Sequence, residues 1–308
     1  MSNRKYSKNK KVQSSEKRME SKRGINDFIM KRRKIFTAVG AVIIVALLIF
    51  VAYDLGAFKN NSSSNSSVNV TIPNPVPWGT FAQISTSNFS DNIHFYWISW
   101  DGCPIGAANS WGLYLAVQQH IPAISNDFIL HKSFSGDSAP HEPGLLFTQN
   151  LSISNGKYYF TAFYMYNQTH TGTVGGTPIA SNQLVSKGLQ EVNATEPSFI
   201  ASWIYQIQTQ TPSQVTKGGS PIAPIGAIGH HLVTALIITG PKGAYYLNGP
   251  YFYLWDLTTN PSAAQSYINS PQYETYVYSP SYVYSNMKGI APISDFAAEI
   301  NTIVDDVS

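Results

Sequence analysis

The stretch YWISWDGCPIGAANSW, residues 96–111, contains Cys103, the only cysteine in a chain of 308 residues. The run Ile93–Trp100 that leads into it is continuously apolar and aromatic, which is typical of a strand buried on both faces. Beyond it, apolar residues between Ala107 and Leu115 recur at helical spacing and predict a helix. A strand, a short Cys-Pro loop and a helix in this order indicate an α/β fold.

The elements expected further along the chain alternate between strand and helix. A strand at Phe128–Phe134 would complete a βαβ unit, with this strand parallel to the one at Ile93–Trp100. The other expected elements are strands at 144–149, 157–167, 225–228 and 231–239, and helices at 181–192, 197–208 and 295–307. We expect the last helix to be capped by Ser294, with Phe296, Ile300 and Ile303 facing inward.

The order of strand, Cys-Pro loop and helix resembles the layout of thioredoxin-like redox sites. A thiol at a helix N-terminus faces unpaired N–H groups and the positive end of the helix dipole, which favour the thiolate. Pro104 fits the first helical turn, where its missing N–H has no consequence. The resemblance implies that Trp100 and Asp101 shape the site and that Pro224 is a cis proline facing the thiol.

The run GCPIGAANSWGLYLAV, residues 102–117, resembles an archaeal thioredoxin-like family known as domain of unknown function 929. That family has a Cys-Pro-x-Cys-Ala motif followed by Ser-Trp-x-Leu-Tyr, and its members are typically membrane-anchored and exported. The matching residues are Gly102, Cys103, Pro104, Ala107, Ser110, Trp111, Leu113 and Tyr114, with looser matches at 144–147 and 224–229. The resemblance implies a thioredoxin-like mixed sheet with a helical insertion at about 135–220, and it is poor beyond residue 250, where about 250–290 is Tyr-rich and irregular.

Gly106 stands where that family has its second cysteine, and this departure bears directly on function. A dithiol site resolves its mixed disulfide with the second thiol, which this chain lacks. Cys103 is then an unreactive remnant, a monothiol that forms mixed disulfides, or a buried small residue. The corresponding functions are a binding or cell-surface module without a cofactor, favoured here, and a monothiol oxidoreductase acting through Cys103 on an exported protein or peptide.

The N-terminal part of the chain differs sharply from the rest. Residues 1–34 contain 13 Lys and Arg against 3 Asp and Glu, and residues 35–53 contain no charge. Nineteen apolar residues are long enough for a transmembrane helix, and the basic flank places the N-terminus in the cytoplasm. We therefore expect a basic arm (1–34) without a nucleic-acid partner, a span in the lipid bilayer (35–53), a Ser/Asn/Pro-rich stalk (54–77) and an exported domain (78–308) in the cell membrane.

The glycosylation sequons are distributed in agreement with this topology. All eight lie after the span: Asn60, Asn61, Asn65, Asn69, Asn88, Asn150, Asn167 and Asn193. Each triplet alone is weak evidence, but their one-sided distribution indicates that residues 54–308 meet the glycosylation machinery. The sequence leaves the oligomeric state open.

Other candidate groups give weaker signals. The adjacent His230 and His231 lie on a predicted hairpin, where alternate side chains face opposite ways, so no metal site is expected. His141-Glu142 is interpreted as a solvated loop. Asp101 would raise the pKa of the neighbouring thiol by like charge. Five aromatic residues could form a sugar-binding face or pack in the core: Tyr245, Tyr246, Tyr251, Tyr253 and Trp255.

This topology predicts the outcome of surface proteolysis on intact cells. Protease added outside should digest the C-terminal domain and spare the basic arm, because only the domain is expected to lie outside. Immunoblotting with tags at the two ends measures both outcomes. Protection of the C-terminal tag in intact cells, with digestion after lysis, would contradict the topology.

Overall fold

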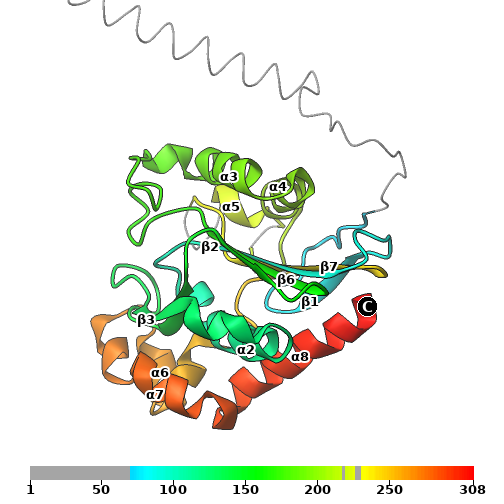
Figure 1. Ribbon diagram of the computed structural model, residues 1–308. Helices are drawn as coiled ribbons and strands as arrows, with labels where there is room; N and C mark the ends of the chain where they lie inside the picture. Colours follow the sequence, from blue (N-terminus) through cyan, green and yellow to red (C-terminus); the bar gives the residue numbers. More distant parts are fainter. Residues whose placement is uncertain (1–69, 217–218, 226–229) are drawn as a thin grey trace, which may run out of the picture. The chain divides into compact units, whose positions relative to one another are not determined.

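The central sheet has six strands in the order β1-β8-β7-β2-β6-β5 (Figure 1). The structure is a computed structural model that describes residues 70–216, 219–225 and 230–308. The strands are β1 (Phe81–Ser85), β2 (Ile93–Ser99), β5 (Leu151–Ser154), β6 (Tyr158–Tyr164), β7 (Ala235–Gly240) and β8 (Gly243–Asn248). Strand β2 lies in the middle, parallel to β6 on one side and antiparallel to β7 on the other. A separate hairpin pairs β3 (Phe128–Lys132) with β4 (Pro143–Phe147).

Helices cover both faces of the sheet, as Figure 1 shows. One face carries α3 (Leu184–Thr195), α4 (Ser198–Tyr205) and α5 (Ile222–Ile225). The other carries α2 (Pro104–His120) and α8 (Ala291–Val307), while α6 (Pro261–Tyr267) and α7 (Pro280–Asn286) lie farther from the sheet, with α7 against β3 and β4. Short helical turns are η1 (Pro122–Asn126), η2 (Ser181–Gln183), η3 (Gln206–Gln210), η4 (Leu254–Leu257), η5 (Pro271–Thr275) and η6 (Met287–Gly289). The fold is therefore a mixed α/β sandwich with the sheet between two helical layers.

The two layers enclose two hydrophobic clusters, and α2 is almost wholly buried between the sheet and α8. Gly112 lies where α2 and α8 pack against each other. A Cβ added there would come within 2.5 Å of the Phe296 ring, so a side chain larger than hydrogen does not fit without movement. Glycine in a helix is less favourable than alanine by about 1 kcal/mol, and the close packing of the two helices offsets this cost.

The expected βαβ unit is present, but its second strand is β6 and not the strand at Phe128–Phe134. Strand β3 pairs antiparallel with β4, and it leaves Ile129 and Leu130 exposed. The run YYFTAFY of β6 buries its C-terminal half and so suits the position beside β2. The chain makes the hairpin before it returns to the sheet, so the insertion expected at about 135–220 contains two strands of the central sheet, β5 and β6.

The segment around Pro224 differs from the sequence expectation. The strand expected at 225–228 is wrong at its first residue, because Ile225 ends the short helix α5; residues 226–229 lie outside the described residues. The strand expected at 231–239 begins only at Ala235, and β7 turns into β8 to form the hairpin. Residues 231–234 stay outside the sheet because Gln208 bonds both backbone groups of Val233, its Oε1 accepting from N at 2.8 Å and its Nε2 donating to O at 3.0 Å.

Both ends of the domain extend further than expected. The helices expected at 181–192, 197–208 and 295–307 are confirmed, with Phe296, Ile300 and Ile303 buried. Helix α8 begins at Ala291, so Ser294 is no cap, and its hydroxyl donates to carbonyls of the preceding turn. The irregular segment at 250–290 contains α6, α7 and short helical turns. Residues 70–77, assigned to the stalk from sequence, pack on the domain through the buried Val76.

The predicted span at 35–53 lies outside the described residues, as do the arm and most of the stalk. Within 70–216, 219–225 and 230–308, no helix has both the length and the hydropathy that crossing a membrane requires.

The close approach of α2 and α8 predicts the effect of Gly112→Ala. Overpacking against Phe296 should destabilise the protein by about 1–3 kcal/mol, which exceeds the gain in helix propensity of about 1 kcal/mol. Gly175→Ala, at an exposed position where the added Cβ would make only an ordinary contact with Thr173 Oγ1 at 3.8 Å, should stay within about 0.5 kcal/mol of the parent. Chemical denaturation of the purified proteins measures both. A more stable Gly112→Ala variant would show that the helices are not packed this closely.

Candidate functional site

Cys103 lies at the start of α2, directly after the central strand β2. It is the N-cap residue of the helix, its carbonyl accepts the N–H of Ala107 at 2.8 Å, and Pro104 occupies the first turn. The side chain is only 4% exposed. The sequence therefore placed the cysteine and the proline correctly, at the helix end where the positive end of the dipole lies.

A chain of two hydroxyl groups ends on the Cys103 sulfur. The Thr234 hydroxyl donates to Sγ at 3.0 Å, and the hydroxyls of Ser99 and Thr234 are 2.7 Å apart. Since Thr234 uses its proton on the sulfur, Ser99 donates to Thr234. All three side chains are buried, and they join the end of β2, the start of α2 and the residue before β7. The residue that meets the thiol is thus Thr234, whereas Pro224 lies within α5.

Gly106 lies against this hydroxyl chain. A Cβ added at Gly106 would collide with Ser99 Oγ, and it would be 3.1 Å from Thr234 Oγ1 and 3.2 Å from the Cβ of Cys103. The space that a second cysteine would need is therefore occupied by the Ser99 hydroxyl. In this packing only glycine fits at position 106.

The surroundings of Cys103 favour the protonated thiol. Burial raises its pKa to about 11, which outweighs the hydrogen bond from Thr234 and the contribution of the helix backbone, both of which lower it. Asp137 adds a smaller upward contribution, so the neighbouring carboxylate that opposes ionisation is Asp137 and not the expected Asp101. Asp101 is half-buried, and burial raises its own pKa to about 6. At neutral pH Cys103 is a thiol and so a weak nucleophile.

A small cavity of about 140 Å³ lies over the Cys103 thiol. Its walls are mainly apolar, and Asp137, Ser138 and His231 supply the polar part. The apolar walls come from Trp78, Trp100, Pro104, Ile105, Val233, Pro250 and Leu254. A cavity of this size and composition suits an apolar side chain or a small organic group better than a charged one.

Three aromatic rings form one side of the site. The sequence did not predict that these rings lie close together. The rings of Trp100 and His170 have centroids 3.6 Å apart, and those of His170 and His231 are 4.2 Å apart. His170 adopts a left-handed backbone conformation with φ of 57°, which is uncommon for residues other than glycine and is often found at functional sites. Burial lowers the pKa of His170 to about 3 and that of His231 to about 4, so both imidazoles are neutral.

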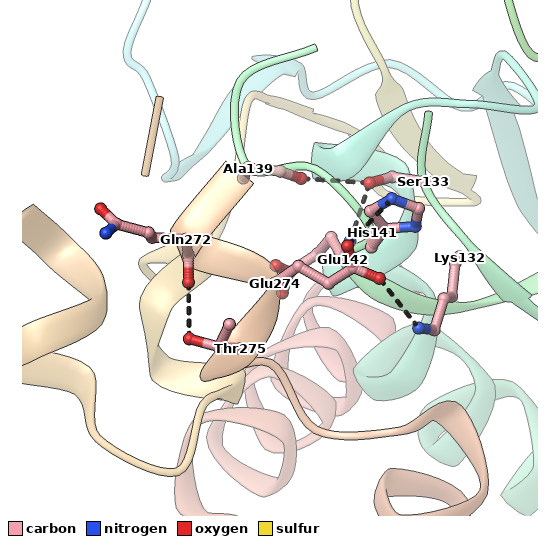
Figure 2. A network of polar contacts seen from close by, with 8 residues as sticks. All are labelled: Lys132, Ser133, Ala139, His141, Glu142, Gln272, Glu274 and Thr275. Atoms are coloured by element: carbon pink, nitrogen blue, oxygen red, sulfur yellow. Dashed lines mark hydrogen bonds and ion pairs between the residues drawn. The ribbon is translucent and has the colours of Figure 1, made fainter. Parts of the chain in front are cut away.

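The loop that carries Asp137 and Ser138 is held by the segment 268–275 (Figure 2). Figure 2 shows the Glu274 carboxylate with Lys132 and His141, and Ser133 bonded to Ala139 and Glu142. The Glu274 carboxylate is 3.8 Å from Nζ of Lys132 and 3.5 Å from Nε2 of His141. Ala139 and His141 both have positive φ, 52° and 62°, so the loop needs these contacts to keep its shape. The same loop lines the cavity over Cys103.

Glu142 is fully buried, and its interpretation as part of a solvated loop is wrong. Its carboxyl Oε2 accepts the Tyr273 hydroxyl at 2.9 Å, while Oε1 has no partner among the described residues. Burial raises the pKa of Glu142 well above its ordinary value, and Asp256 adds to this effect. A neutral Glu142 therefore connects the loop to the Tyr-rich segment. The sequence did not predict that this segment packs against the loop.

The other candidate residues are dispersed. Asn88, Asn150 and Asn193 are exposed, whereas Asn167 bonds Thr171 with both ends of its amide; the remaining sequons lie outside the described residues. Tyr246 is buried and Tyr253 is 65% exposed, so the five aromatic residues do not share one face. In the described part of the chain, no three His, Cys, Asp or Glu side chains converge as metal ligands.

Comparison with known proteins identifies a family whose description assigns no function. The family model for a domain of unknown function (DUF929) matches residues 80–307, which is nearly the whole described domain. Neither the curated proteins nor the solved structures contain a match to this chain.

The buried carboxyl predicts a specific pH dependence for Glu142→Gln. The raised pKa means that the contribution of Glu142 to stability is complete below about pH 4.5 and is lost as pH rises through the pKa of the folded state. The Gln variant lacks this loss, so it should gain stability relative to the parent between pH 4 and pH 8. Urea denaturation at both pH values measures the difference.

Two further variants serve as controls. Tyr273→Phe keeps the carboxyl but removes the hydrogen bond that lowers its pKa, so its stability should fall more steeply with pH than that of the parent. Glu142→Ala removes the acceptor and should cost about 2–4 kcal/mol below about pH 4.5, and less as pH rises, because it also lacks the titrating carboxyl. A difference between the parent and Glu142→Gln that does not change with pH would contradict a neutral buried Glu142.

Proposed function

Because this chain belongs to the DUF929 family, whose name assigns no activity, we propose its function from the Cys103 site. The proposed function is that of a membrane-anchored, extracytoplasmic binding module with a thioredoxin-like fold and no dithiol chemistry. The observation that carries this proposal is the hydroxyl chain from Ser99 through Thr234 to Cys103, which occupies the space of a second thiol. The ligand site is the cavity over Cys103.

The arrangement of the sheet supports a thioredoxin-like fold. The parallel pair β2 and β6, with α2 between them in the chain, is followed by the antiparallel hairpin β7–β8 on the other side of β2, and α8 closes the domain. Thioredoxin-like folds share this order. The virtual Cβ at Gly106 is 3.2 Å from the Cβ of Cys103, near the roughly 3.5–4.5 Å of real disulfides. The helix start thus keeps the spacing of a Cys-x-x-Cys motif.

The state of the thiol supports binding over catalysis. Enzymes that exchange disulfides need an accessible thiolate of lowered pKa, and Cys103 is buried with a pKa of about 11. The rival function, a monothiol oxidoreductase, would need the burial of Cys103 to change on meeting its partner, since burial opposes both ionisation and access. The uncharged run at 35–53 and the basic arm before it support the membrane anchor and the extracytoplasmic location.

The test of this function is trapping of mixed disulfides at neutral pH. The folded protein, treated with excess glutathione disulfide or an aromatic disulfide, should form almost no adduct, because the thiol is protonated and covered. The same protein in urea should react fully, which proves that the cysteine is intact. Rapid stoichiometric adduct formation by the folded protein, measured by mass spectrometry, would favour the monothiol enzyme instead.

A restored second cysteine tests the account of Gly106. Gly106→Cys alone should destabilise the protein and form no 103–106 disulfide, because the new Cβ collides with Ser99. The double variant Ser99→Ala/Gly106→Cys removes the hydroxyl and should form the disulfide on oxidation. Ser99→Ala alone is the matched control for lost hydrogen bonding. A disulfide that forms readily in the single variant would show that Ser99 does not fill this space.

A further inference from the structure

A second and larger cavity, of about 720 Å³, lies on the other side of His231 from Cys103. His231 and Asp137 line both cavities, so they form the wall between them. Its remaining lining residues are Phe134, Gly136, His170, Ser181, Asn182, Leu184, Val185 and His230. These come from the loops after β3 and β6, from the start of α3 and from the segment before β7.

Two imidazoles in this cavity have ring nitrogens with no hydrogen bond to the described residues. His231 is 4% exposed, and in the described part of the chain it makes ring contacts but no hydrogen bond. The Nε2 atom of His170 is buried and has no hydrogen-bond partner among the described residues. Buried polar atoms without partners are rare in folded proteins and often mark the place of a ligand. The left-handed backbone of His170 holds its ring in this position.

The N-terminus of α3 opens onto the same cavity. Four residues of its first turn and of η2 line the cavity: Ser181, Asn182, Leu184 and Val185. Neither α3 nor η2 has a side-chain cap, and their first turns contain no acidic residue. The first N–H groups of a helix have no partner within the helix, and they carry the positive end of its dipole. This helix end can therefore bind an anion.

We propose that this cavity binds an oxyanion group, the sulfate, phosphate or carboxylate of a larger ligand, between the start of α3 and the imidazoles of His170 and His231. Each neutral imidazole supplies one N–H donor, and each gains a charge when protonated. The site is independent of the reactivity of Cys103, since none of its donors touches the thiol.

Binding should tighten as pH falls. The titratable groups that face the cavity are Asp137, His170, His230 and His231. Burial lowers the pKa of His170 and His231 and raises that of Asp137, so an empty site holds neutral imidazoles and a readily protonated carboxyl. A bound anion reverses the effect on the imidazoles and favours their protonation. Loss of the Asp137 charge removes the only carboxylate that faces the anion in the cavity's described lining.

Sulfate binding to the full chain in non-ionic detergent tests the proposal, because the charge of sulfate is constant between pH 4 and pH 7. Titration at ionic strength matched with chloride should show saturable binding that tightens about tenfold or more from pH 7 to pH 5. Formate, titrated in parallel, stands for carboxylates, and the tighter of the two identifies the class of oxyanion. No saturable binding of either anion at pH 5 would overturn the proposal.

Variants locate the binding site. His170→Gln and His231→Gln should each weaken binding about tenfold. His120→Gln is the control, since His120 bonds Asn301 on the opposite side of the sheet, and it should leave affinity unchanged. If the histidine variants do not fold, Asp137→Asn should strengthen binding at pH 7 and flatten its pH dependence. Affinity that is unchanged in both histidine variants, or a pH dependence unchanged by Asp137→Asn, would contradict the proposed site.

Discussion

The hydrogen bond from the Thr234 hydroxyl to the Cys103 sulfur connects the parts of the fold on which the site depends. It joins the start of α2 to the residue before β7, and through Ser99 it reaches the end of β2. These hydroxyls occupy the volume beside Gly106, so they set the chemistry as well as the packing. Burial under apolar cover keeps the proton on the sulfur, although the hydrogen bond from Thr234 and the helix backbone both favour the thiolate. Burial raises the pKa of this thiol, which opposes its reactivity independently of the missing second cysteine.

Burial favours the neutral form of acidic and basic side chains in the described domain, and it does so by shifting their pKa values in opposite directions. Burial raises the pKa of Asp101 and Glu196 to about 6, so their contribution to stability declines as pH rises from about 4 through 6. Burial lowers the pKa of His170 and His231 to about 3 and 4, so their contribution declines as pH falls below about 6.5. The two effects overlap between pH 4 and pH 6.5 and offset each other. We therefore expect the domain to keep its fold across mildly acidic conditions, where an anion at the histidines would add stability.

The sequence predicted the local parts of this structure better than the long-range ones. Three local features could be predicted from the periodicity and composition of residues that are close together in the sequence. They are the buried strand, the Cys-Pro helix start and the amphipathic α8. The pairing of β2 with β6 could not be predicted, because β3 and β6 are both apolar runs and the choice depends on which one the sheet buries. The long-range contacts join residues that are 70 to 131 positions apart in the sequence. They are the contacts of Cys103 with Thr234, of Trp100 with His170, and of Glu142 with Tyr273. Without related sequences, no local pattern indicates such pairs.

The pKa of the Cys103 thiol in the folded protein tests the central claim most directly. The chemical shift of its Cβ carbon, followed by NMR in protein labelled at cysteine, reports the fraction of thiolate without a reagent having to reach the sulfur. The account predicts a thiol that stays protonated through pH 9, in line with a pKa of about 11. A thiolate that forms below pH 7 while the fold is intact would contradict it, and would make Cys103 an activated nucleophile.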